Sequence, residues 1–218
     1  SDFMHNKFSQ FGTLIEGQEE LLTLPNNVVF EHGQWQGFLF GQSWGDYYEK
    51  LAQDKVEWMK RDDAEVDEER QQVIPWLIFR WNDYYLEIKK GQEGPHTRLY
   101  NKYSLGFGGH VFKHELDKVG SLNDWIRERF LQEMDYKGNL KISTLGVVND
   151  NTDELGHTHF GVVYLIEGDS NVISSKKNLA LRLSPLSEFS GDDVRYWDRW
   201  SQMVYRQLRD LEIYNARK

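Results

Sequence analysis

The chain has 218 residues, of which 39% are hydrophobic and 28% charged, a composition typical of a folded globular protein rather than a disordered one. Its 26 Lys and Arg against 35 Asp and Glu give a formal charge of −9, which argues against a protein that coats nucleic acid phosphates. The absence of cysteine excludes disulfides, thiolate metal sites and cysteine nucleophiles. No apolar run reaches the length of a membrane span and the first residues lack the layout of a signal peptide, so we expect a cytoplasmic protein that does not bind membranes.

Residues 1–70 are predicted to form an N-terminal extension that packs on the main domain. Residues 26–40 are rich in Val, Phe and Gly, which is typical of two short strands around a turn. Over 43–60, aromatic and aliphatic residues recur at steps of three and four, which predicts an amphipathic helix with Ser43 as its N-cap. The acidic run 61–69 then ends the extension as a solvated linker or helix face.

The remaining residues, 71–218, are expected to form one domain that ends in a long helix. Residues 73–79 are almost continuously apolar, which is typical of a strand buried on both faces. An Asn-Asp turn joins this strand to 84–88 in a predicted hairpin. Strands and helices then interleave, which favours an α+β class with helices packed on a mixed sheet. The other predicted elements are a helix over 123–134, strands over 140–148, 159–166 and 179–183, and a long C-terminal helix capped by Asp192.

The most informative segment is 105–136. It holds a glycine-rich turn that includes Gly109, then Glu115, then a predicted helix that carries Arg129 and Glu133. This arrangement resembles the signature box of the Nudix superfamily, G-x5-E-x7-R-E-U-x-E-E-x-G-U, in which U is an aliphatic residue. The first glycine and glutamate of the box are matched with the family's spacing.

The resemblance extends beyond the box to most of the chain. It favours one bacterial branch of Nudix proteins, usually described as predicted phosphoesterases. The segments that resemble this branch are 36–38, 72–75, 98–99, 104–110, 149–150, 156–161 and 197–201.

The family implies an α/β/α sandwich and hydrolysis of a nucleoside diphosphate linked to another group. Cleavage of a phosphoanhydride needs divalent ions on the phosphates and an activated water, so the resemblance implies Mg²⁺ or Mn²⁺ and a small nucleotide-like ligand. Three glutamates of the box helix hold these ions, because residues three and four apart share a face of a helix. If catalysis has been lost, a protein partner or a second copy of the chain is the alternative partner.

The box is degenerate in this chain. When Arg129 is aligned with the box arginine, Phe130 and Met134 replace two of the metal-binding glutamates and Glu133 remains as the third. Thirteen residues, rather than seven, then separate Glu115 from the arginine. Each lost carboxylate removes an oxygen ligand and a negative charge, so metal binding is expected to weaken sharply.

A second register aligns Arg127 and Glu128 with the arginine–glutamate step of the box. It places Leu131 and Gln132 at the paired glutamates, which matches the box less well. We therefore expect the first register.

The predicted catalytic residues are the helix carboxylates Glu133 and Glu128. The alternative for Glu133 is an ion pair with Arg129 on an exposed face, and the alternative for Glu128 is a solvated face. Glu115 is expected to pair with Arg129, as the family implies, rather than to act in catalysis. The predicted metal ligands are Glu133, Glu115 and Glu154.

The predicted ligand-binding residues surround the glycine turn and the box helix. Arg98 is the leading candidate for an anionic ligand because a guanidinium binds phosphate through two parallel hydrogen bonds, and its alternative is an ordinary surface charge. Phe130 and Met134 are expected to belong to the core or to a pocket wall. The full set of predicted ligand-binding residues is Arg98, Gly108, Gly109, His110, Phe130 and Met134.

Two sets of polar residues, an acidic loop and four histidines, have more than one possible role. The loop that contains Asp150, Asp153 and Glu154 is a place for an additional base or metal ligand, but such composition is also typical of a simple turn. The histidines suggest a zinc site, although their separation in sequence favours a phosphate pocket or surface positions. They are His110, His114, His157 and His159.

Two functions follow from these observations. The first is a divergent Nudix hydrolase of nucleoside diphosphate derivatives, with Glu133 as its main remaining ligand. The second is a Nudix-like module that has lost catalysis and binds a nucleotide or a protein partner, with Phe130 and Met134 lining its pocket. The residues at these two positions favour the second function, whereas the intact glycine turn favours the first.

Overall fold

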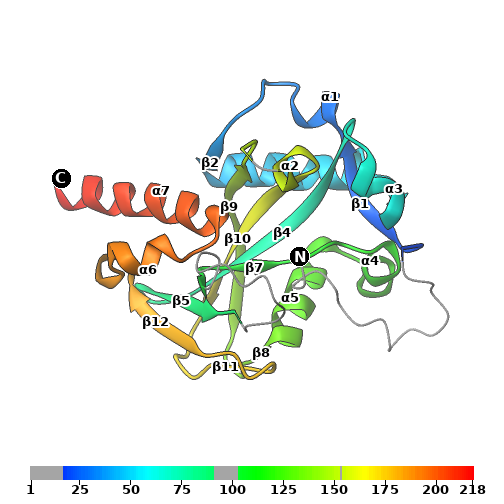
Figure 1. Cartoon of the computed structure of the whole chain (residues 1–218). Helices are drawn as coiled ribbons and strands as arrows, with labels where there is room; N and C mark the ends of the chain where they lie inside the picture. The colour runs from blue at the N-terminus through cyan, green and yellow to red at the C-terminus, as the bar shows by residue number, and fades with distance from the viewer. Residues whose placement is uncertain (1–16, 91–102, 153) are drawn as a thin grey trace.

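A computed structural model describes residues 17–90, 103–152 and 154–218. In these ranges a large mixed sheet forms the centre of the molecule and helices pack on both of its faces (Figure 1). The predicted α+β class with a mixed sheet is therefore confirmed.

Strands and helices alternate along the described part of the chain. The strands are β1 (Glu20–Pro25), β2 (Gly37–Phe40), β3 (Glu57–Lys60), β4 (Arg70–Trp81), β5 (Tyr84–Lys89), β6 (Tyr103–Ser104), β7 (Phe107–Gly108), β8 (Met134–Asp135), β9 (Leu140–Asn149), β10 (His159–Gly168), β11 (Ser174–Ser175) and β12 (Leu181–Pro185). The α-helices are α1 (Asn26–Val29), α2 (Gln42–Asp54), α3 (Arg61–Val66), α4 (Lys113–Val119), α5 (Leu122–Glu133), α6 (Gly191–Arg195) and α7 (Arg199–Ala216).

The main sheet runs in the order β12-β5-β4-β10-β9-β2. Its two central strands, β4 and β10, are parallel, whereas β9 and β5 pair with them in antiparallel fashion. β1 joins the sheet through β4, and β2 joins it through β9, so strands from the first 70 residues are part of the central sheet. The domain boundary at residue 70 stays a prediction.

Alternation along β4 separates two hydrophobic cores. Val73, Leu77 and Phe79 face the core that α5 and α2 cover. Trp76 and Ile78 face the other core, which α7 covers. Successive side chains of a strand point to opposite faces of the sheet, so a nearly continuous apolar run can serve both cores. The prediction of a strand buried on both faces is confirmed, since these five side chains are 5% exposed or less.

The N-terminal part differs from its prediction in two places. Residues 26–40 form a short helix, α1, and one strand, β2, instead of two strands. The helix expected over 43–60 ends at Asp54, and its last predicted residues form β3. The reason is that β3 pairs with β1, a strand the sequence analysis missed, and such long-range pairing overrides a local helical pattern.

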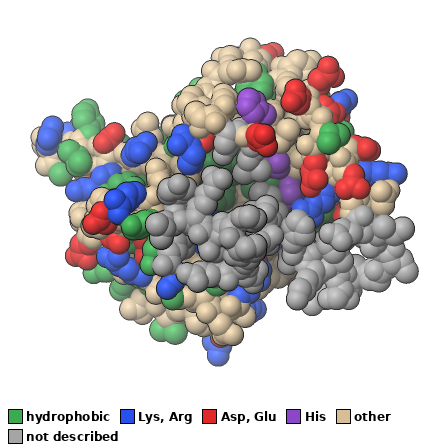
Figure 2. All heavy atoms as spheres, viewed as in Figure 1, with side chains coloured by type: hydrophobic (Ala, Val, Ile, Leu, Met, Phe, Trp, Pro, Cys, Tyr) green, Lys and Arg blue, Asp and Glu red, His purple; other side chains and the backbone are tan. Residues whose placement is uncertain are grey.

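The face shown in Figure 2 carries charges of both signs, and Asp and Glu side chains gather around α3. The acidic run begins on this helix, where Asp62, Asp63 and Glu65 are exposed while Arg61 and Ala64 are buried. Of the two predicted roles, a solvated helix face is therefore the one found for the first part of the run.

The C-terminal helix is broken in two. Ser190, and not the predicted Asp192, caps α6, because the Ser190 hydroxyl accepts a hydrogen bond from the N–H of Asp193. A second cap follows at Asp198, whose carboxylate accepts from the N–H of Ser201 at 2.8 Å and starts α7. Two caps in succession start two helices where the sequence analysis expected one.

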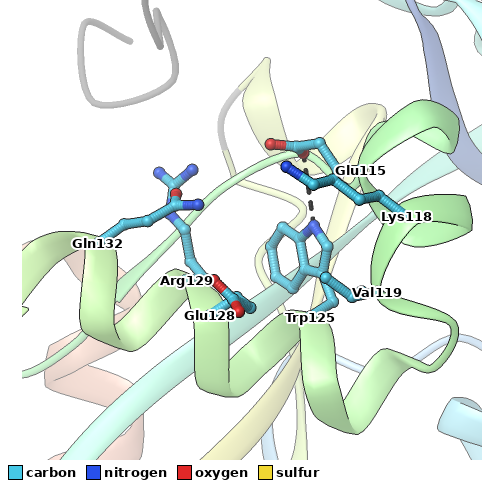
Figure 3. Close-up of a pocket in the computed structure, with 7 residues that line it drawn as sticks. All are labelled: Glu115, Lys118, Val119, Trp125, Glu128, Arg129 and Gln132. Carbon is cyan, nitrogen blue, oxygen red and sulfur yellow. Dashed lines mark hydrogen bonds between the residues drawn. The ribbon is translucent and has the colours of Figure 1, made fainter. Parts of the chain in front are cut away.

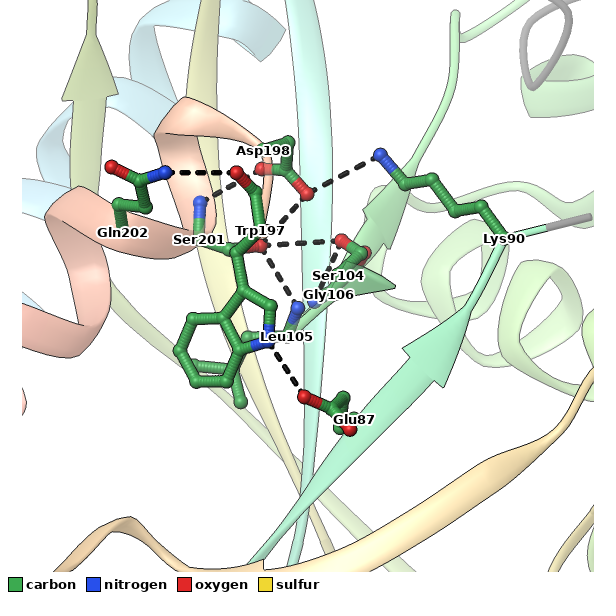
Figure 4. Close-up of polar contacts among 9 residues, drawn as sticks. All are labelled: Glu87, Lys90, Ser104, Leu105, Gly106, Trp197, Asp198, Ser201 and Gln202. Atoms are coloured by element: carbon green, nitrogen blue, oxygen red, sulfur yellow. Dashed lines mark hydrogen bonds and ion pairs between the residues drawn. The ribbon is translucent and has the colours of Figure 1, made fainter. Parts of the chain in front are cut away.

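The start of α7 is tied to the backbone that leads into the glycine turn (Figure 4). The Ser201 hydroxyl donates to Asp198 Oδ2 and accepts from the N–H of Leu105, each at 2.9 Å. Trp197 is fully buried and donates through Nε1 to Glu87 at 2.7 Å. Burial raises the pKa of Glu87, although this hydrogen bond opposes the effect. Helix α7 therefore fixes the position of the chain just before the glycine turn.

A buried carboxylate joins α7 to the end of β9. Asp150 is 1% exposed and accepts hydrogen bonds from Arg199 of α7, from Gln36 Nε2 at 2.8 Å and from Thr152 Oγ1 at 2.6 Å. Burial on its own would raise the pKa of Asp150, but these hydrogen bonds outweigh it and lower the pKa to about 2. Three segments that are distant in sequence thus meet at one ionised group.

Asp150→Asn is expected to lower the free energy of unfolding by about 2 kcal/mol at about pH 6, because the amide cannot replace the ionised acceptor. The folded-state pKa lies below the ordinary value of 3.8, so this contribution is complete above that value and is lost as the pH falls towards 2. Urea denaturation of both proteins across this range should show a difference that shrinks with falling pH. The control is Asp192→Asn, whose side chain is 85% exposed, and a constant difference for Asp150→Asn would contradict the assignment.

Candidate functional site

The glycine turn between β7 and α4 packs closely on its neighbours. A Cβ added to Gly108 would lie 2.6 Å from the carbonyl oxygen of Pro75 in β4. A Cβ added to Gly109 would lie 3.0 Å from Nη2 of Arg129. Glycine at these two predicted site positions therefore lets the backbone approach β4 on one side and the Arg129 guanidinium on the other.

Two helices, rather than one, lie between the glycine turn and the end of the box. Helix α4 ends at Gly120, whose φ of +89° is a left-handed conformation that glycine adopts without strain. Ser121 then caps α5 by accepting a hydrogen bond from the N–H of Asp124 at 3.1 Å. The segment between Glu115 and Arg129 therefore contains the end of α4 and this turn.

One face of α5 is buried against the sheet. Ile126 and Phe130 are fully buried, and Met134, the residue after α5, is 2% exposed. Phe130 stacks on Phe79 of β4 and on Phe107 of β7, with ring-centre distances of 5.6 and 6.2 Å. The predicted ligand-binding residues Phe130 and Met134 therefore pack in the core and do not line the pocket on α5, because the helix turns them towards the sheet.

A pocket of about 110 Å³ opens on another side of α5 (Figure 3). Glu128 and Gln132 lie there one helical turn apart, and both are exposed. Figure 3 shows Arg129 and Gln132 extending from α5, while Glu115 and Lys118 extend from α4. Two carboxylates and two cations thus meet in one small pocket. Its lining residues are Glu115, Lys118, Val119, Trp125, Glu128, Arg129 and Gln132.

Glu133, the predicted main metal ligand, lies inside the protein. Its carboxylate is 5% exposed, accepts a hydrogen bond from Lys177 Nζ at 2.8 Å and lies 3.5 Å from Nη2 of Arg129. The alternative ion pair with Arg129 is therefore formed, but it is buried and not on an exposed face. Because two cations already neutralise this carboxylate, Glu133 is poorly placed to hold a metal ion in this conformation.

Within the described ranges, Glu115 does not form the expected ion pair with Arg129. Its Oε1 accepts hydrogen bonds from Trp125 Nε1 and from the N–H of Phe112, both at 3.4 Å. Arg129 is 4% exposed, and its Nε has no hydrogen-bond partner among the described residues. Arg129 also lines the pocket, and a guanidinium binds anions through its N–H groups.

The acidic loop follows β9 and precedes β10. Asp150 is occupied by its hydrogen bonds to neighbouring segments, and Glu154 is exposed. The predicted metal-binding role of Glu154 stays a prediction. Arg98 and Asp153 lie outside the described residues, so their predicted roles stay predictions.

A row of buried polar side chains lies at the start of β4 and β10. The rings of His110 and His159 are 5.6 Å apart, and each side chain is 6% exposed. Gln72 pairs with His159 across the strands and is 1% exposed, and neither atom of its amide has a partner among the described residues. No three His, Asp or Glu side chains of the described part converge as a metal site, so the suggested zinc arrangement is not formed there.

The sequence analysis gave no site role to four residues of the α5 pocket, namely Lys118, Val119, Trp125 and Gln132. Trp125, Glu128 and Gln132 are separated by steps of three and four residues. This spacing indicates one face of a helix and could have identified them as a group. Lys177 was also missed, and no local signal could have found it, because 44 positions separate it from the carboxylate it binds.

No helix in the described ranges is long and apolar enough to cross a membrane. A scan against models of known protein families finds no match.

Two comparisons with known proteins place the chain. It is 30% identical over 200 residues to "Protein YmaB" of Bacillus subtilis (strain 168), across 85% of this chain and 95% of that protein. A solved structure described as "Tm1382, a putative Nudix hydrolase" superposes with a TM-score of 0.68 at 22% identity, over 88% of this chain and 100% of that chain. At this identity the structural likeness speaks for the fold alone. The predicted Nudix-like fold is thereby confirmed, and the chain belongs to the family of Protein YmaB.

Proposed function

We propose that this chain binds a phosphate-bearing, nucleotide-like ligand in the α5 pocket and does not hydrolyse it by the metal-dependent Nudix route. The observation that carries the proposal is the orientation of α5 about its own axis, which determines the side chains that face the core and those that face the pocket. Phe130 and Met134 face the core, and Glu128 is the one carboxylate that this helix presents among the pocket-lining residues. The resemblance implies three such carboxylates for hydrolysis, so the charge that would hold the activating ions is largely missing.

The pocket suits the phosphate end of such a ligand. Arg129 and Lys118 line it beside the carboxylates of Glu115 and Glu128, and a phosphate oxygen would accept hydrogen bonds from these two cations. A volume of about 110 Å³ admits a phosphate group and a few waters rather than a whole nucleotide. The remainder of the ligand would therefore lie outside this pocket.

A residual hydrolase is the second candidate, and one observation favours it. Glu115 from α4 lines the same pocket as Glu128, and Mg²⁺ that arrives with a nucleotide keeps several waters and needs only one or two protein carboxylates. In that case these two glutamates would hold Mg²⁺ or Mn²⁺, which would neutralise charge on the phosphates. The other predicted helix ligand fits less well, because Glu133 would have to leave Lys177.

Binding and hydrolysis are separated by measuring both on the same protein. With EDTA present, isothermal titration with ADP should show saturable binding, and Arg129→Lys should weaken it about tenfold or more because lysine lacks the planar set of donors. Arg127→Lys on the same helix is the matched control and should change little. With a panel of nucleoside diphosphate derivatives and Mn²⁺, mass spectrometry should find no cleavage above a protein-free blank.

Glu128→Gln distinguishes the two candidates. For a binding module, it should leave ADP binding in EDTA intact or slightly stronger, since a negative charge near the phosphates is removed. Cleavage by the wild type in Mn²⁺ that Glu128→Gln abolishes would reject the binding module in favour of the residual hydrolase.

The rotation of α5 predicts which substitutions can restore a metal site. Phe130→Glu should lower the free energy of unfolding by about 3–5 kcal/mol, because it replaces a core aromatic ring with a carboxyl group. Gln132→Glu, on the exposed face, should change stability by about 0.5 kcal/mol or less and add a carboxylate to those of Glu115 and Glu128. Urea denaturation and Mn²⁺ titration followed by electron paramagnetic resonance test both. A stable Phe130→Glu protein with increased Mn²⁺ affinity would show that the first register is correct.

A further inference from the structure

A second pocket, of about 300 Å³, lies beside α2 and shares no lining residue with the α5 pocket. Its lining residues are His32, Ser43, Trp44 and Tyr47, so three aromatic rings and one hydroxyl surround it. The rings of His32 and Tyr47 lie 5.5 Å apart at an angle of 56°, and Trp44 is 37% exposed. These side chains form an aromatic wall in which Trp44 remains partly open to solvent.

The pocket is held by buried structure behind it. Tyr48 is 1% exposed and donates a hydrogen bond through its hydroxyl to the carbonyl oxygen of Val29 at 2.6 Å. Its ring contacts Tyr47 edge to face at 5.1 Å and Trp44 in a stacked arrangement at 6.5 Å. Because the rings of Trp44 and Tyr47 both contact the buried ring of Tyr48, little conformational entropy would be lost when a ligand binds.

The segment of the chain that lines this pocket is acidic in sequence. The segment 26–49 contains Glu31, Asp46 and Glu49 and no Lys or Arg. Burial and, after it, the Glu31 carboxylate raise the pKa of Tyr47, which places a negative charge near this ring. A phosphate would be repelled here, whereas a cation would be attracted both by the carboxylate and by the electron-rich faces of the rings.

We propose that the α2 pocket binds a small quaternary ammonium compound, such as choline. An alkylated ammonium group has an apolar surface that fits an aromatic wall and a positive charge that the ring faces and Glu31 attract. The volume lies at the lower end of the range of small-molecule clefts, which favours a compact ligand. This site is independent of the α5 pocket and of the function proposed for it.

Isothermal titration of the full chain with choline chloride at about pH 8, at constant ionic strength, tests the proposal. We expect saturable binding in about the millimolar range, because a few partly exposed rings contribute about 0.5–2 kcal/mol each. The uncharged isostere 3,3-dimethylbutan-1-ol has nearly the same shape, and its affinity should be at least about fivefold lower than that of choline. Absence of saturable choline binding, or equal binding of the isostere, would overturn the proposal.

Matched variants locate the site. Trp44→Leu should weaken choline binding about fivefold, whereas Phe40→Leu should leave it unchanged, since Phe40 is similarly exposed, at 42%, but does not line the pocket. Glu31→Gln is exposed and should fold normally, so it provides a second test if Trp44→Leu perturbs the structure, and it should weaken binding about two- to threefold. Equal losses for Trp44→Leu and Phe40→Leu, or no loss for Glu31→Gln, would exclude this pocket as the site.

Discussion

The packing of Phe130 between Phe79 and Phe107 sets the rotation of α5, and the candidate site depends on that rotation. Truncating a buried phenylalanine typically costs about 3–5 kcal/mol, whereas an ion pair on an exposed helix face contributes about 0.5 kcal/mol. The aromatic contacts therefore decide which face of α5 meets the sheet. Glu128 and Gln132, which lie on the exposed side of α5, line the pocket.

The same orientation of α5 buries the carboxylate of Glu133 and places it between two cations. Glu133 lies between Arg129 and Lys177, and removing one partner of such a buried pair commonly costs about 3–5 kcal/mol because a charge is left uncompensated. Metal binding at Glu133 would have to disrupt this arrangement, so these contacts disfavour a bound cation at this carboxylate.

The sequence predicted the class and the main elements of the fold because these depend on apolar patterns, such as the run 73–79 in β4. It did not predict β3, because the partner strand β1 is distant in sequence. The site was harder still, since the two alignments of the box differ by two residues. Two residues turn an α-helix by about 200°, so the two alignments place opposite faces in the pocket. Because the turn at Gly120 allows the distance between Glu115 and the arginine to vary, the motif fits either alignment. Only the packing of α5 distinguishes the two alignments.

The net charge of −9 acts in opposite directions on the two pockets. It repels a phosphate as a whole, so the α5 pocket must rely on a short-range contact with the buried Arg129, where solvent screens the interaction weakly. It attracts a quaternary ammonium ion at long range, and the Glu31 carboxylate, which acts electrostatically on Tyr47 of the α2 pocket, adds to this attraction. Added salt screens both long-range effects, so it should favour anion binding at α5 relative to cation binding at α2. Salt dependence therefore reports which pocket a charged ligand occupies, independently of any substitution.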